Sequence, residues 1–378
     1  MTNDSFVIPY SSVMPASLLG LGTALPPNRV AQEQGARVAQ VLCLDPRQSS
    51  LVPTLYRQTE ITGRSMVIGE DVVRDVIAGT RDSGSVFLPT GRPGDRGPTT
   101  AERMRVYGEE APKLALDASR RALADAHVQA ETITHLVTVS CTGFAAPGVD
   151  IALIRGLGLA ATTERVHVGF MGCHGALNGL RVARGLAAAE PGATVLLCTV
   201  ELCSIHYHYG WDPKRVVANA LFADGAGAAV IRPDGPADAW QLAAHGACLF
   251  PDSAYAMTWD VGDHGFDMAL STKVPNLIAR HLLQWLDGWL GRHGLTIDRI
   301  GSWAVHPGGP RVLNSVTDAL ALEPSATKLS HEVLTRHGNM SSPTILFILD
   351  RLRRAGSPLP CVALGFGPGL AVEAALFI

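Results

Sequence analysis

Short apolar runs of strand length alternate along this chain with longer segments in which apolar residues recur at helical spacing. The strand-like runs lie at 134–140, 193–200, 225–231, 301–305, 360–366 and 370–378. The helical segments lie at 111–126, 174–190, 274–292 and 343–355. Strands that alternate with helices predict an α/β fold in which helices cover the faces of a sheet.

Local signals refine this picture at a few points. The run 193–200 carries no charge, so we expect it to be buried on both faces. The helix over 343–355 is expected to take Ser342 as its N-cap, with Pro343 at its first position. A Pro/Gly break at 233–236 separates an N-terminal from a C-terminal part of the chain.

Composition narrows the class of protein. The 378 residues are 47% hydrophobic and only 17% charged, which excludes a disordered chain and indicates extensive buried surface. The net charge of −3 gives no broad basic surface, so nucleic acid is not an expected partner. We find no apolar stretch of membrane-spanning length and no secretion signal in the first 15 residues, so we expect a cytoplasmic protein.

The seven cysteines suggest chemistry rather than disulfides. Their number is odd and no C-x-x-C pair occurs, which argues against a disulfide framework and a zinc site; no metal site is expected. Cys173 stands out because it lies between a strand-like run and a helix, with Gly172 and Gly175 beside it. The positive end of the helix dipole favours a thiolate there, and the glycines admit a substrate. The alternative is a buried structural cysteine.

Two further polar residues occupy similar positions. His306 follows an apolar strand and precedes a Gly/Pro-rich turn, where active-site groups of α/β folds collect. Asn339 lies in a glycine-led turn before a helix, where its amide either donates hydrogen bonds to a substrate oxygen or only forms the turn. Together with Cys173, these residues fit a protease or an acyl-transfer site.

The segments around these residues resemble the type III polyketide synthases, the chalcone synthase-like branch of the thiolase superfamily. The resemblance runs from residue 20 to the C-terminus. It is carried by Gly172-Cys173, ALFADG at 220–225, HPGGP at 306–310, GNMSS at 338–342 and GFGPG at 365–369. Two further stretches, 140–148 and 201–204, look more like bacterial members than plant enzymes.

This resemblance implies a thiolase fold, with duplicated βαβαβαββ halves in a five-layered αβαβα core, and a homodimer. The N-terminal half would span 1–235 and carry the nucleophilic Cys173. The C-terminal half would span 236–378 and carry His306 and Asn339, which would promote decarboxylation of malonyl-CoA and stabilise the enolate. An acyl-CoA starter would be held on Cys173. CoA thioesters are then substrates, and no cofactor is expected.

Further residues receive roles only through the resemblance. Phe222 and Phe266 would be gatekeepers between a CoA tunnel and a buried cavity. Other substrate contacts are implied for Cys141, Cys203, His206, Ser341, Gly367 and Pro368, and CoA contacts for Arg57 and Arg64. The small Cys141 and Cys203 would admit a longer acyl chain. His206 would narrow the cavity or act in cyclisation, unless these side chains merely pack.

The expected function is therefore decarboxylative condensation of malonyl-CoA onto the starter, followed by cyclisation to a pyrone, a resorcinol or a related aromatic product. Alkylpyrones or alkylresorcinols from a fatty acyl starter are the leading expectation, with dihydroxyphenylacetate-type and tetrahydroxynaphthalene-type synthases open. The alternative is an initiating ketoacyl-ACP synthase, which performs one condensation; the GFGPG segment and the phenylalanine gatekeeper disfavour it. A cysteine protease and a non-catalytic interaction protein fit the chain less well.

Overall fold

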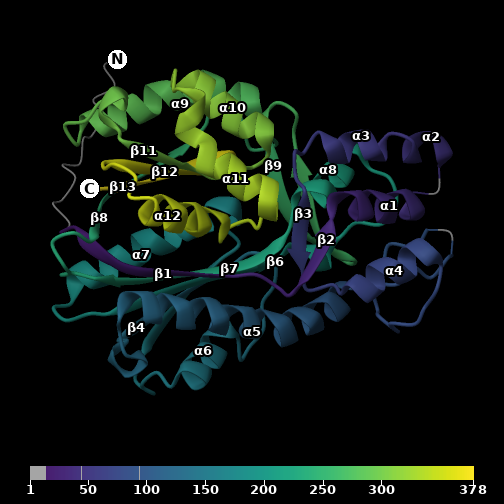
Figure 1. Ribbon diagram of the computed structural model, residues 1–378, viewed down its shortest axis with the longest axis horizontal. Helices are drawn as coiled ribbons and strands as arrows, with labels where there is room; N and C mark the ends of the chain where they lie inside the picture. Colours follow the sequence, from purple (N-terminus) through teal and green to yellow (C-terminus); the bar gives the residue numbers. More distant parts are fainter. Residues whose placement is uncertain (1–13, 44, 93) are drawn as a thin grey trace, which may run out of the picture.

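The computed structural model describes residues 14–43, 45–92 and 94–378 (Figure 1). The expectation about a secretion signal falls almost entirely outside the described residues. The largest sheet has the strand order β11-β12-β13-β8-β1-β7-β6-β4-β5. Its strands are β1 (Ala16–Ala24), β4 (His135–Ser140), β5 (Glu164–Gly169), β6 (Val195–Leu202), β7 (Asp224–Arg232), β8 (Trp240–Leu249), β11 (Ser302–Val305), β12 (Cys361–Gly367) and β13 (Ala371–Phe377).

Helices and two small hairpin sheets complete the described chain. The hairpin sheets pair β2 (Asn28–Ala31) with β3 (Gly63–Met66), and β9 (Met257–Gly262) with β10 (Gly265–Leu270). The helices are α1 (Gln32–Leu42), α2 (Pro46–Ser49), α3 (Val52–Arg57), α4 (Glu70–Ala78), α5 (Thr100–Ala126), α6 (Val149–Leu157), α7 (Gly175–Ala189), α8 (Pro213–Leu221), α9 (Val274–Gly291), α10 (Pro310–Ala319), α11 (Lys328–His337) and α12 (Thr344–Arg354). Among the described helices, none is both long and apolar enough to cross a bilayer.

The alternation of side chains along each strand builds the layers. In β6, Val195 packs in the core around α7 and α12, whereas the next residue, Leu196, packs against α5 and α6. In β12, Ala363 faces the same central helices, whereas Leu364 faces α9 and α10. Strands β1 and β8 pair over only three residues, so the ladder divides into two half-sheets around α7 and α12 (Figure 1). The predicted αβαβα order of layers is confirmed.

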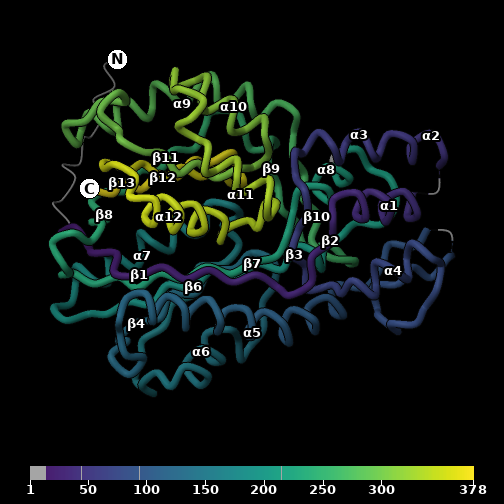
Figure 2. The backbone as a smooth tube through the Cα atoms, viewed as in Figure 1, coloured from purple at the N-terminus to yellow at the C-terminus, as the bar shows by residue number. Residues whose placement is uncertain are grey.

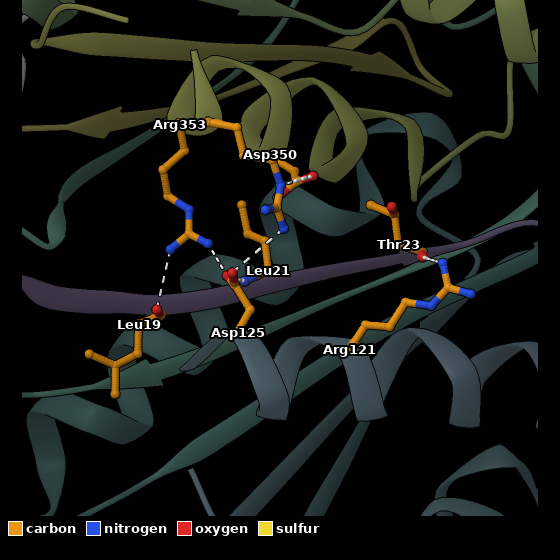
Figure 3. A network of polar contacts seen from close by, with 8 residues as sticks. Leu19, Leu21, Thr23, Arg121, Asp125, Asp350 and Arg353 are labelled. Carbon is orange, nitrogen blue, oxygen red and sulfur yellow. Dashed lines mark hydrogen bonds and ion pairs between the residues drawn. The ribbon is translucent and has the colours of Figure 1, made fainter. Parts of the chain in front are cut away.

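Strand β1 lies where the layers join, beside β7 along its length (Figure 2). The carboxylate of Asp125, on α5, accepts a hydrogen bond from the backbone N–H of Leu21 at 2.9 Å. It also forms an ion pair with Arg353 of α12 (Figure 3). Arg353 also donates to the carbonyl oxygen of Leu19 at 3.2 Å. One carboxylate therefore ties an outer helix, a strand and a central helix together.

With one exception, each strand and helix predicted from the sequence begins and ends within two residues of its predicted bounds. Helix α5 begins at Thr100, well before the predicted start at residue 111. Thr99 caps it, because its hydroxyl accepts from the Glu102 N–H while the Glu102 carboxylate accepts from the Thr99 N–H at 2.8 Å. Pro112 within the helix weakens the helical pattern ahead of residue 111.

The predicted cap of α12 is wrong. The N-cap position is occupied by Pro343, which has no side chain able to cap the helix. The Ser342 hydroxyl instead donates a hydrogen bond of 2.6 Å to the carboxylate of Glu201, on β6. This serine therefore connects the start of α12 to strand β6 and does not cap the helix.

Candidate active site

Cys173 lies in a single 3₁₀ turn, Gly172–His174, between β5 and α7. Gly172 adopts a φ of 75°, and a Cβ atom there would lie 2.5 Å from the Pro368 side chain. Only glycine fits such a turn. A Cβ at Gly367 would likewise collide with the His174 ring. Gly367 and Pro368 therefore support the turn that carries the cysteine, and neither lines the cavities described below, where substrate contacts were expected.

His306 follows the last residue of β11, as predicted. Its backbone N–H donates to the carbonyl oxygen of Leu364 on the parallel neighbour β12 at 2.8 Å, which extends the ladder by one residue. The side chain is only 1% exposed, and neither ring nitrogen has a hydrogen-bond partner. Buried polar atoms without partners are rare in proteins, so this imidazole is placed to meet a ligand.

Asn339 follows α11 and is held by its backbone. Its N–H donates to Leu221 and its carbonyl accepts from Ala223, both at 2.9 Å. The side-chain oxygen accepts a hydrogen bond of 2.8 Å from the N–H of Ser341, which fixes the amide orientation because a backbone N–H can only donate. The amide nitrogen Nδ2 is left buried without an acceptor in bonding geometry.

The three predicted residues line one cavity of about 400 Å³. Burial raises the pKa of Cys173 to about 11 and lowers the pKa of His306 to about 3, so each group taken alone prefers its neutral form. The thiolate expected at this helix terminus is therefore opposed by burial. It requires a proton acceptor, and the unpaired imidazole of His306 is one in the same cavity.

A second, smaller cavity of about 40 Å³, the inner cavity, shares Phe222 with the first, the outer cavity. The gatekeeper role of Phe222 stays a prediction. The inner cavity is lined by the other residues expected there: Cys141, Cys203, His206, Phe266 and Ser341.

His206 is held in one tautomer. Its Nδ1 accepts from the N–H of Phe266 at 2.9 Å and its Nε2 bonds the carbonyl oxygen of Thr142 at 2.6 Å. Burial lowers its pKa to about 3, and its ring stacks on Phe266 at 4.2 Å between centroids. With both nitrogens engaged, His206 braces the wall, which does not support a role in proton transfer during cyclisation.

Glu201 was missed by sequence reasoning. Its buried carboxylate accepts hydrogen bonds from the backbone N–H groups of Cys141 and Thr142, the Thr142 hydroxyl and the Cys141 thiol. Burial raises its pKa, an effect that the hydrogen bonds oppose. The available signal was a carboxylate inside an otherwise uncharged, fully buried strand. This network fixes the backbone of Cys141 and Thr142, which line the inner cavity.

The two predicted CoA contacts have different positions. Arg57 is exposed at the end of α3. The nearby residues Leu55 and Gln58 line the outer cavity. Arg64 is 1% exposed and donates to the backbone carbonyl oxygen of Phe222 at 2.7 Å, so it is not placed to meet a phosphate at the surface. Arg311, which follows the HPGGP segment and was not considered, is exposed and lines the outer cavity.

Comparisons with known proteins cover almost the whole chain. The N-terminal and C-terminal domain models of chalcone and stilbene synthases match residues 9–236 and 241–378. The alpha-pyrone synthesis polyketide synthase-like protein Pks18 of Mycobacterium tuberculosis is 32% identical over 96% of this chain and 91% of its own. The 1,3,6,8-tetrahydroxynaphthalene synthase of Streptomyces peucetius is 33% identical over 94% and 91%.

A solved structure extends the likeness to three dimensions. PKS-I of the brown alga Ectocarpus siliculosus matches with a TM-score of 0.85 and 29% identity, over 96% of this chain and 98% of that one. Likeness in sequence and in structure thus covers nearly the whole chain. The chain belongs to the chalcone and stilbene synthase family and is a type III polyketide synthase.

Proposed function

We propose that Cys173 carries the acyl starter while His306 and Asn339 bind the thioester oxygen of malonyl-CoA. The observation that carries this proposal is the pair of buried side chains with unpaired nitrogens beside Cys173 in one cavity. A neutral imidazole and an amide both donate hydrogen bonds without adding charge. Each such donor at a developing oxyanion is worth roughly 2.7–4 kcal/mol of transition-state stabilisation.

Each condensation then proceeds in two steps, decarboxylation and carbon–carbon bond formation. The bond between the malonyl carboxylate and its α-carbon breaks, CO₂ leaves, and the electron pair passes into the thioester enolate. The enolate carbon attacks the acyl carbonyl on Cys173, and the sulfur of Cys173 leaves with its electron pair. The extended chain is now a CoA thioester, and it returns to Cys173 by thioester exchange before the next condensation or cyclisation.

An alkyl starter is the proposed substrate class, giving an alkylpyrone or alkylresorcinol. A third cavity of about 50 Å³ adjoins the inner one, and Arg64, Met66 and Tyr207 line both. Its other walls are mainly apolar, with Val38 and Phe87 among them. Apolar walls beyond the gate suit a hydrocarbon chain, and the name of Pks18 refers to alpha-pyrone synthesis. The name of a second relative, 1,3,6,8-tetrahydroxynaphthalene synthase, favours an aromatic product as the second candidate.

At the mouth of the outer cavity, Arg57 and Arg311 are the proposed contacts for the anionic end of CoA. No cofactor enters this scheme, and the cytoplasm is the proposed location. A homodimer is proposed through β5, because this strand ends the sheet and no further described strand pairs with its outer edge. Val166 on β5 is 43% exposed and the following Phe170 is 39% exposed, which is apolar surface that a partner would cover.

The test is to incubate the full chain with malonyl-CoA, alone and with short-, medium- and long-chain acyl-CoA starters, and to identify the products by mass spectrometry. Alkylpyrones or alkylresorcinols from the longer starters support the proposal. Aromatic products from malonyl-CoA alone would favour the second candidate. A single extension that depends on an acyl-carrier protein, or unchanged product formation by Cys173→Ala, would overturn the assignment.

A further inference from the structure

Three side chains able to bind a cation meet at the end of the N-terminal half-sheet remote from Cys173. His135 and Glu164 are the first residues of the parallel strands β4 and β5, and they are partners in the ladder. Glu190 directly follows α7. The His135 Nε2 atom lies 3.5 Å from a Glu190 carboxylate oxygen and 3.9 Å from a Glu164 oxygen. Along β5, roughly 17 Å separates this cluster from the turn that carries Cys173.

A hydrogen bond at Nδ1 orients the imidazole of His135. Its side chain is 3% exposed, and Nδ1 lies 2.8 Å from the Thr134 hydroxyl. That hydroxyl accepts from the Thr194 N–H at 2.9 Å, and its own hydrogen can go either to the Thr194 carbonyl oxygen at 3.2 Å or to Nδ1. When the hydroxyl donates to the carbonyl oxygen, Nδ1 carries the ring proton. In that tautomer Nε2, which has no hydrogen-bond partner among the described residues, presents its lone pair to the two carboxylates.

Without a cation, this arrangement brings together groups that repel one another. The three ligand atoms all lie within 4.8 Å of one another, so in this tautomer two carboxylates and a nitrogen lone pair face the same point. Glu190 also stands at the carboxyl end of α7, where the helix dipole disfavours negative charge. We propose that His135, Glu164 and Glu190 bind a divalent transition-metal ion, with Zn²⁺ as the best fit.

The geometry and the ligand types select this class of ion. Ligand atoms about 2.0–2.2 Å from a tetrahedral Zn²⁺ lie roughly 3.3–3.6 Å apart, so the 3.5 Å pair already fits and the Glu164 carboxylate needs only a small rotation. The Glu164 side chain is 73% exposed in the single chain, which allows that rotation. One imidazole with two carboxylates suits Zn²⁺ better than Ca²⁺ or Mg²⁺, which prefer oxygen ligands alone.

The bound ion would stabilise the fold and would not take part in the reaction. It would tie the starts of β4 and β5 to the end of α7, the helix that begins directly after the Cys173 turn. We therefore expect it to raise stability without taking part in condensation. This inference does not depend on the proposed starter or product.

The test uses the full chain, stripped with a chelator and dialysed, then titrated with ZnCl₂ by calorimetry and with CoCl₂ by visible absorption. We expect one strong Zn²⁺ site and cobalt bands without a sulfur-to-metal charge-transfer component. The double variant Glu164→Gln/Glu190→Gln should bind Zn²⁺ at least about tenfold more weakly. Glu131→Gln, an exposed carboxylate just ahead of β4, is the matched control and should bind like the wild type.

Thermal unfolding gives the second measurement. Zn²⁺ should raise the unfolding midpoint of the wild type and of Glu131→Gln, but not that of the double variant. In the metal-free state, the double variant should unfold no lower than the wild type, because two repelling charges have been removed. A lower midpoint would show that the glutamates pair with a protonated His135, which overturns the proposal. So would Zn²⁺ binding that survives in the double variant or that is lost in Cys173→Ala.

Discussion

The two polar atoms of the Asn339 amide have opposite surroundings. The oxygen is engaged by the Ser341 N–H, and the nitrogen is left in the cavity without an acceptor. The residue is therefore held for donation, which a turn-forming asparagine would not require.

Replacing Asn339 by alanine should lower the rate of malonyl-CoA decarboxylation by about 10²–10³-fold, since one oxyanion donor is lost. The unfolding midpoint should fall modestly, because the buried N–H of Ser341 loses its acceptor while the backbone bonds of residue 339 remain. Asn314→Ala, the same change at an exposed position of α10, is the control. A loss smaller than tenfold would contradict the proposed role. Release of CO₂ from labelled malonyl-CoA measures it.

Proton transfer between Cys173 and His306 can be tested separately from turnover. Burial holds the pKa of the thiol at about 11, so without an acceptor only a very small fraction is thiolate at neutral pH. His306→Gln should therefore slow alkylation of Cys173 by iodoacetamide at least about a hundredfold at pH 7. The exposed His127→Gln should leave it unchanged. Equal rates in both variants would mean that the helix terminus alone activates the sulfur.

At the scale of elements, the turn before α7 depends on close packing between distant segments. Gly172→Ala places a Cβ against Pro368 at a positive φ and should cost about 1–3 kcal/mol of unfolding free energy. It should also reduce condensation, because Cys173 is displaced. Gly185→Ala, within α7 and with open space around it, should instead stabilise by about 0.5–1 kcal/mol. Urea unfolding of both variants measures the contrast, and equal costs would refute it.

Sequence reasoning succeeded where local pattern and burial coincide. The uncharged run of β6 is buried on both faces, and the three site residues each follow or precede an element as predicted. It failed where a polar side chain serves a distant partner. Ser342 was predicted to cap a helix but bonds Glu201, and Arg64 was predicted to contact CoA but is buried. Such partners are set by tertiary contacts, which periodicity does not record. The division into halves at 235 and 236 stays a prediction.

At the scale of the whole molecule, the exposed edge of β5 predicts how two copies meet. Val166→Lys should place a charge in the proposed interface and shift the protein toward a monomer in analytical ultracentrifugation. Val261→Lys on β9, a valine that is 56% exposed, is the matched control and should leave the assembly unchanged. An unchanged dimer in the Val166 variant, or a monomeric wild type, would exclude this interface.

Phe222 and Asn339 face each other in a parallel β-bridge, so the residue between the cavities and the residue proposed to hold the enolate share one piece of backbone. A substitution at Phe222 that shifts the local backbone therefore also shifts Asn339, although the backbone hydrogen bonds depend on neither side chain. Product length and turnover are thereby mechanically linked. Variants selected for bulkier products should accordingly have a lower turnover rate. Substitutions in the 338–342 segment, rather than further ones at Phe222, should then restore that rate.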